Sequence, residues 1–278
     1  MNQDTLTQNL RWHRFGASLS LAATVSIAAI LFAILAFIFV RGIGHFSPAF
    51  FLENPVDLGR AGGVFPIIVS TLILCGVALL IAVPLGVTTA VYLTEYTKEG
   101  WATLLIRFGA ECLAGIPSII FGLFGFMLFV VTLGMGWSIL SGGLTLACMI
   151  LPTIIRTAEE AIKTVPKGLR EVGYSLGATK SQIITRIILP QARSGIVTGI
   201  ILALGRAIGE TAAVIFTTGI SIEMPTSLFD SARSLSVHFY LLAREGISMD
   251  MAYTTALALM LIILIINLIT NLVLARKR

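Results

Sequence analysis

Charged side chains are scarce in this sequence: they make up 12% of the residues, against 56% for hydrophobic ones. A typical soluble domain carries about 25% charged residues, so this chain has too few to cover a surface that faces water. The composition therefore excludes an ordinary soluble domain and predicts that most of the surface faces lipid. The net charge is +5, but the basic residues stand between apolar stretches rather than in one patch. We interpret them as loop residues on one side of a membrane, and we expect no nucleic-acid partner.

Residues that carry chemistry are also few. The three cysteines are solitary and lie inside apolar runs: Cys75, Cys112 and Cys148. The three histidines lie in the tail or in loops: His13, His45 and His238. This pattern excludes a CxxC pair and a disulfide framework, and we expect no metal, no cofactor and no enzymatic activity such as intramembrane cleavage of a lipid phosphate. A phosphate-cradling GxxxxGK[ST] loop is also missing, so ATP is not expected to bind this chain in that way.

Long apolar runs are plentiful. A membrane helix needs about 20 mostly apolar residues, and the sequence holds six such runs, at 17–40, 65–93, 108–133, 137–155, 195–220 and 252–274. The first run is longer than the core of a signal peptide, which has about 7–15 residues, so we predict a retained helix. We therefore predict an all-α integral membrane protein with six transmembrane helices.

The distribution of Lys and Arg predicts the orientation of these spans. Basic residues precede the first span, flank the turn between the second and third, fill the segment between the fourth and fifth, and end the chain. They include Arg11, Arg14, Lys98, Arg107, Lys163, Lys167, Lys180, Arg186, Arg193, Arg276, Lys277 and Arg278. The turn between the third and fourth spans, at 134–136, has no charge. The positive-inside rule then places both termini in the cytoplasm.

The segment 157–192, before the fifth span, predicts a helix-turn-helix. A short helix is expected to begin after Pro166, because proline tolerates the first turn of a helix, and to break near Gly177. Thr179 can cap a second helix, with Gln182 completing a capping box, and Pro190 is expected to stop that helix. Its apolar stripe comprises Ile183, Ile184, Ile187 and Ile188. Physics alone leaves two readings open: docking into a groove on a soluble partner, or resting on the lipid interface.

The spacing of this segment resembles the EAA signature of permease subunits in binding-protein-dependent ABC importers of type I. The matching residues are Glu171, Gly173, Gly177, Ile187, Leu189 and Pro190. Val172 and Gly173 stand where the signature has two alanines. The resemblance implies a type I importer permease fold in which this loop is a cytoplasmic coupling helix that fits a groove on a separate ATPase.

Two charged pairs lie in apolar spans. Arg206 and Glu210 are four residues apart in the fifth predicted span, and Arg156 and Glu159 are three apart at the end of the fourth. A charge at the bilayer centre costs roughly 2.5–3.5 kcal/mol on insertion scales, so these residues are expected to face each other or a polar interior.

Two functions for these pairs remain open. They can be structural ion pairs that neutralise each other, or they can line a substrate pathway, because a guanidinium presents a fork of donors to phosphate oxygens. A further i,i+4 pair, Arg107 and Glu111, is expected to lie at the interface at the start of the third span.

The substrate is indicated by resemblance. The stretches 62–72, 83–95, 115–125 and 206–219 resemble phosphate-specific importer permeases, with 206–219 closer to the PstA-type than to the PstC-type subunit. The resemblance implies a permease core at 61–278 after an N-terminal region at 1–60. It also implies an inner-membrane heterodimer with a PstC-type permease, two cytoplasmic ATPase subunits and an extracytoplasmic phosphate-binding protein. The alternative is an importer of the same architecture for sulfate, molybdate, tungstate or phosphonate.

Overall fold

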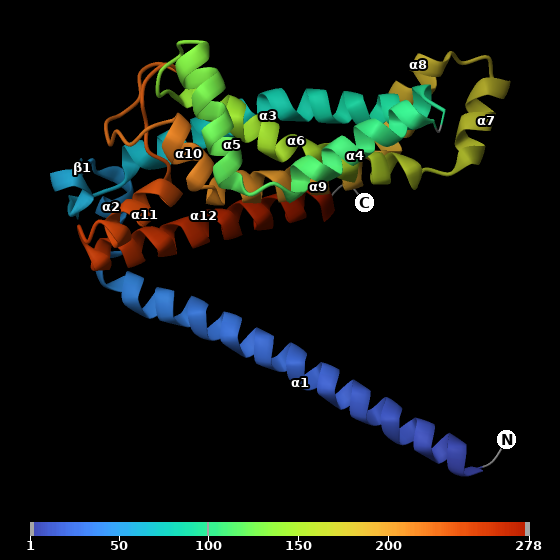
Figure 1. Cartoon of the computed structure of the whole chain (residues 1–278), viewed down its shortest axis with the longest axis horizontal. Coiled ribbons are helices and arrows are strands. Elements are labelled where there is room, and N and C mark those ends of the chain that lie inside the picture. The colour runs from blue at the N-terminus through green and yellow to red at the C-terminus, as the bar shows by residue number, and fades with distance from the viewer. Residues whose placement is uncertain (1–2, 99, 276–278) are drawn as a thin grey trace.

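The first long helix stands apart from the rest of the molecule. The computed structural model describes residues 3–98 and 100–275, and α1 (Gln3–Gly42) leaves the other helices at an angle in Figure 1. Its contact is with α12 (Met249–Ala275), near Gly42, whose carbonyl accepts a 3.1 Å hydrogen bond from Thr254. The apolar side chains of α1 that lie beyond this contact are exposed. Of the predicted basic residues, 276–278 and the side chains of Arg11 and Arg14 lie outside the described parts.

The core of the bundle is the pair α3 (Phe65–Val91) and α6 (Ile139–Lys163), which α9 (Leu189–Gly209) covers, and α12 packs on α9. Glycine lets the first two approach closely. A Cβ added at Gly86 would lie 2.6 Å from Ile154 of α6, and one at Gly143 would lie 2.5 Å from Val77 of α3. Small residues allow such contact between helix backbones in lipid, where no hydrophobic force drives helices together.

The two ends of the bundle differ. One end holds short elements: η1 (Ile43–His45), α2 (Pro48–Leu52), the antiparallel pair β1 (Pro55–Val56) and β2 (Ala61–Gly62) around η2 (Asp57–Gly59), and α11 (Leu235–Arg244). The opposite end holds α7 (Lys167–Ser175), α8 (Lys180–Ile183), η5 (Ile184–Ile188) and the end of α3, which continues as the π-helix η3 (Tyr92–Tyr96). We call the segment α7–η5 the elbow.

The third predicted span is bent rather than straight. α4 (Trp101–Gly115) and α5 (Ser118–Gly125) meet at 102°, and α5 continues as the π-helix η4 (Phe126–Thr132). Pro117 explains the bend, because it lacks an N–H and disfavours helical geometry at Ile116, which is extended at ψ 132°.

The fifth predicted span is both longer and more interrupted than the sequence suggested. A continuous helical stretch runs from Lys180 to Gly209, so the prediction that Pro190 ends a helix is wrong. The π-helical turn η5 directly precedes α9, and Pro190 falls in the first turn of α9, where the missing N–H is tolerated. The helix instead ends at Gly209, and after Glu210 (ψ 130°) a separate helix α10 (Ala212–Thr217) begins.

The count of spans agrees with the prediction once the bend is included. Among the described residues, five helices are long and apolar enough to cross a membrane, and the bent pair α4–α5 would be the sixth. The predicted fold class, an all-α membrane protein with six spans, is confirmed.

Candidate functional site

The elbow has the local structure that its sequence predicted. Gly177 adopts φ +76°, a left-handed conformation that glycine enters without strain. Thr179 then caps α8: its hydroxyl accepts from the Gln182 N–H at 3.4 Å, and the Gln182 side chain accepts from the Thr179 N–H at 2.8 Å. The predicted break and the predicted capping box are both confirmed.

The two limbs of the elbow pack through Gly173. A Cβ there would lie 2.9 Å from Ile183 and 3.2 Å from Ile187. Val172 of α7 and Leu176, just after it, are exposed apolar residues, at 58% and 81%. Of the remaining residues of the signature, Glu171, Gly177 and Pro190 are exposed, and Ile187 and Leu189 are half-buried.

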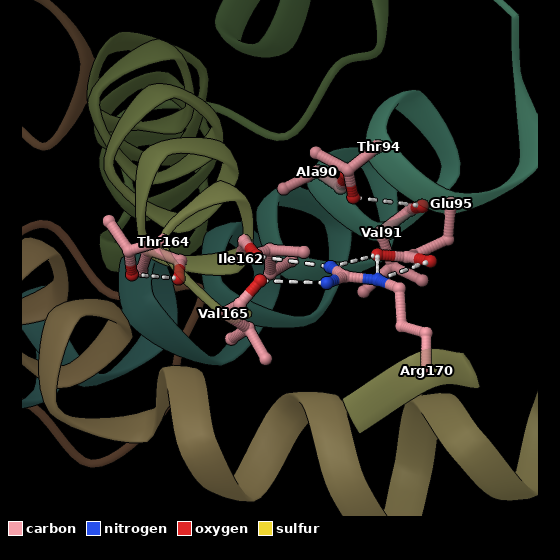
Figure 2. A network of polar contacts seen from close by, with 9 residues as sticks. Ala90, Val91, Thr94, Glu95, Ile162, Thr164, Val165 and Arg170 are labelled. Carbon is pink, nitrogen blue, oxygen red and sulfur yellow. Dashed lines mark hydrogen bonds and ion pairs between the residues drawn. The ribbon is translucent and has the colours of Figure 1, made fainter. Parts of the chain in front are cut away.

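Glu95 and Arg170 form an ion pair that sequence reasoning missed. Arg170 Nη2 lies 2.7 Å from Glu95 Oε1, and its Nε lies 3.1 Å from the same oxygen. The guanidinium also donates to the carbonyl of Val165 at 2.8 Å and to that of Ile162 at 3.2 Å (Figure 2). Both side chains are largely buried, at 19% and 10% exposure. The two residues are 75 positions apart, so no helical spacing could have revealed the pair.

A cluster of charged residues lies between α4 and α6, and its ion pairs run across the two helices. Arg107 of α4 lies 2.7 Å from Glu159 of α6, and Arg156 of α6 lies 3.3 Å from Glu111 of α4. Lys163 adds a second contact to Glu159 at 2.7 Å. We call the set Arg107, Glu111, Arg156, Glu159, Glu160 and Lys163 the charge cluster.

Of the two readings left open for Arg156 and Glu159, the structure does not show the one in which they pair with each other. Arg156 instead contacts Glu111 and, at 3.7 Å, Glu160. The cluster borders a cavity of about 270 Å³. A second cavity, of about 470 Å³, lies beside the elbow, and Arg107 and Lys163 line both. The two cavities are thus adjacent.

Arg206 lies in the last turn of α9, and Glu210 follows the end of that helix. Their side chains form a loose pair, with 3.9 Å between Arg206 Nε and Glu210 Oε1. The side chain of Ser118, the first residue of α5, lies beside the Glu210 carboxyl group, and the Glu210 carbonyl accepts from Ser236 at 2.5 Å. The bend at Pro117 and the break after Gly209 therefore meet. We call Ser118, Arg206 and Glu210 the junction.

Interrupted helices at membrane depth leave backbone groups unpaired, and they are tolerated only where protein or a water-filled cavity surrounds them. In transporters, discontinuous helices typically form the substrate site. Gly122 brings α5 against α10, since a Cβ there would lie 2.9 Å from the carbonyl of Ala212. The junction is thus held between two short helices and carries one guanidinium and one carboxylate.

A buried basic pair lies at the end of the molecule opposite the elbow. Arg233 is 5% exposed and His238 is fully buried. Arg233 Nη1 lies 3.2 Å from His238 Nδ1, and its Nε donates to the carbonyl of Ile220 at 3.0 Å. Burial, with the nearby guanidinium, lowers the pKa of His238 to about 3, so the ring is neutral. This pair fastens the loop before α11 to that helix.

Comparison with known proteins identifies a family. The family model described as "Binding-protein-dependent transport system inner membrane component" matches residues 82–278. The phosphate transport system permease protein PstA of Yersinia pestis is 32% identical over 93% of this chain and 90% of its own length. PstA 1 of Mycobacterium tuberculosis strain H37Rv is 39% identical over 75% of this chain and 68% of its own length.

Solved structures agree on the fold. A bacterial ABC transporter involved in the import of the acidic polysaccharide alginate matches with a TM-score of 0.70 at 17% identity, covering 98% of this chain and 99% of that one. The inward-facing methionine ABC transporter MetNI matches with a TM-score of 0.60 at 20% identity, covering 78% of this chain and 94% of that one. At such identities these structures establish the importer permease fold and nothing about substrate.

Proposed function

Because the chain belongs to the family of inner-membrane components of binding-protein-dependent transport systems, we propose that it is a permease subunit of an ATP-driven importer of inorganic phosphate. The relatives named above as phosphate transport permeases support this substrate. The observation that carries the proposal is the junction, where Ser118, Arg206 and Glu210 meet between two interrupted spans.

The junction suits the transient binding of an anion. The guanidinium of Arg206 is 35% exposed and its contact with Glu210 is loose, so donors remain for phosphate oxygens. Glu210 would weaken the hold of Arg206 on the anion and so allow release. Its carboxylate could also accept a hydrogen bond from the protonated oxygen that phosphate carries near neutral pH.

The charge cluster would form the next part of the pathway. Its carboxylates and basic side chains are paired across α4 and α6, so separation of these helices would free guanidinium groups for the passing anion. In this role Arg156 and Glu159 belong to the substrate pathway together with Arg206 and Glu210. The adjacent cavity beside the elbow then leads to the cytoplasm.

The elbow would receive the driving force. Val172 and Leu176 are exposed on it, and an amphipathic helix can place such residues in a groove on a soluble partner. We propose that this partner is one of two cytoplasmic ATPase subunits, and that Glu171, Gly173, Gly177, Ile187, Leu189 and Pro190 shape the contact. Both termini would then be cytoplasmic.

Two further partners complete the proposed importer. A homologous permease, of the PstC type, would form a heterodimer with this chain, and the exposed apolar length of α1 is available to it or to lipid. An extracytoplasmic phosphate-binding protein would deliver the anion to the end that holds β1, β2 and α11.

ATP-dependent uptake of phosphate by the complex reconstituted in liposomes tests the proposal. Arg206→Gln removes a charge-assisted interaction worth about 1.5–3 kcal/mol, so we expect uptake to fall about 10- to 100-fold. Arg193→Gln is the matched control, because Arg193 is an exposed arginine on the same helix as Arg206. Equal uptake by the two variants would refute the proposal. So would inhibition of labelled phosphate uptake by sulfate or molybdate as strong as that by unlabelled phosphate.

A further inference from the structure

The two limbs of the elbow differ in how they are attached to the membrane-embedded helices: Ile183, Ile184 and Ile188 of the second limb are buried against α3 and α6, whereas the first limb, α7, is attached at few places. α7 packs mainly on α8 and η5, which are parts of the elbow itself. Towards the bundle, a cavity of about 470 Å³ borders α7, with Thr94, Lys163 and Glu171 among its lining residues. Apart from the chain connections and its packing on the second limb, α7 can reach the bundle directly only by a side chain that crosses this space.

Arg170 is that bridge. It is on α7, and Glu95, to which its guanidinium is bonded, lies in η3, the continuation of α3. The carbonyls that accept its other hydrogen bonds belong to Ile162, in the last turn of α6, and to Val165, just after it. One side chain thus ties the elbow to both helices of the central pair (Figure 2).

The contact points lead directly to the charge cluster. Ile162 precedes Lys163, and Lys163 contacts Glu159, which in turn contacts Arg107 of α4. A displacement of α7 that pulls the end of α6 would therefore strain the ion pairs that hold α4 to α6. The order along this path is elbow, Arg170, end of α6, charge cluster.

The neighbouring contact differs in kind. Lys180, on the second limb of the elbow, lies 4.8 Å from the ring centroid of Tyr96, which follows Glu95. Tyr96 is 53% exposed, and cation–π contacts at exposed sites are weak. The largely buried Arg170, with its bonds to Glu95, Ile162 and Val165, is held more rigidly than Lys180. Lys180 therefore provides a matched control at the same surface.

We propose that Arg170 is a positioning residue that transmits displacement of the elbow to the ends of α3 and α6 by its simultaneous bonds to Glu95, Ile162 and Val165. This inference rests on the proposed function for its source of motion, the ATPase. Loss of the bridge should leave the ATPase bound and active while the membrane helices no longer follow it. Hydrolysis would then be uncoupled from transport.

The test measures phosphate taken up per ATP hydrolysed in proteoliposomes that contain the whole complex. Arg170→Gln and Glu95→Gln should each lower this ratio at least 10-fold while the ATPase still co-purifies, and Lys180→Gln should stay within 2-fold of wild type. Arg170→Lys, which cannot reach carboxylate and both carbonyls together, should not restore coupling. The double charge reversal Glu95→Arg with Arg170→Glu should restore part of it. If Arg170→Gln does not assemble, Glu95→Gln decides.

A second readout separates this inference from the substrate assignment. Spin labels at Tyr92, on η3, and Leu268, on α12, are exposed positions whose distance should change on ATP binding in the wild-type complex. The change should vanish in Glu95→Gln. A wild-type complex that shows the change but takes up no phosphate would overturn the proposed substrate and not the bridge. A ratio within 2-fold of wild type in Glu95→Gln, or an unaltered distance change in it, would overturn the bridge.

Discussion

Glu159 is the residue on which the contact between α4 and α6 most depends. Its side chain is 9% exposed and touches Arg107 and Lys163, each at 2.7 Å. Replacing it by Gln removes the charge and leaves Arg107, at 28% exposure, without this counter-charge in a partly buried position.

The magnitude follows from the exposure of each partner. The charge-assisted contact with Arg107 is worth about 1.5–3 kcal/mol. The contact with Lys163, which is 51% exposed, adds no more than about 1 kcal/mol. Because Gln keeps one acceptor oxygen, we expect Glu159→Gln to lower the free energy of unfolding by about 2 kcal/mol.

Glu160 supplies the matched control, one position along the same helix. It lies 3.7 Å from Arg156, with side-chain exposures of 69% and 61%, so Glu160→Gln should cost no more than about 0.5 kcal/mol. Unfolding of the complex by SDS in mixed micelles measures both variants. Equal destabilisation by the two substitutions would refute the assignment of Glu159 as the centre of the cluster.

Three other predictions concern separate parts of the chain. Glu210→Gln should change the rate of phosphate uptake while leaving assembly with the partner subunits intact, and unchanged uptake would remove Glu210 from the pathway. Gly173→Val should weaken co-purification of the ATPase, because the added side chain meets Ile183, whereas Gly168→Val, at an open position, should not; equal binding would contradict the packing of the elbow. The neutral His238 has its pKa lowered to about 3, so the unfolded chain binds an extra proton as pH falls below about 6.5 and stability should decrease by at most about 1.4 kcal/mol per pH unit. Thermal unfolding from pH 7 to pH 5 should show a shallower dependence in His238→Gln; an identical slope would contradict a neutral His238.

Features that depend on neighbouring residues in the sequence could be predicted without a structure. The capping box of Thr179 and Gln182 and the left-handed Gly177 follow from local hydrogen bonding and backbone sterics. The membrane spans could also be predicted from local sequence, because a span needs only an apolar run long enough to cross lipid.

Features that depend on which helices are neighbours could not be predicted in this way. Spacing along one helix suggested that Arg156 would face Glu159, but packing of α4 on α6 brought Glu111 to Arg156 instead. Pro190 was expected to end a helix, yet it fell in the first turn of the next one, after a π-turn. The pair Glu95 and Arg170 joins distant segments, and only the fold brings them together.

The central claim is that this chain moves phosphate only when a separate ATPase drives the elbow. Uptake of labelled phosphate into proteoliposomes, with the permease pair and binding protein present and the ATPase either included or omitted, tests it most directly. We expect uptake that requires both ATP and the ATPase. Phosphate movement of equal rate without the ATPase would contradict the claim.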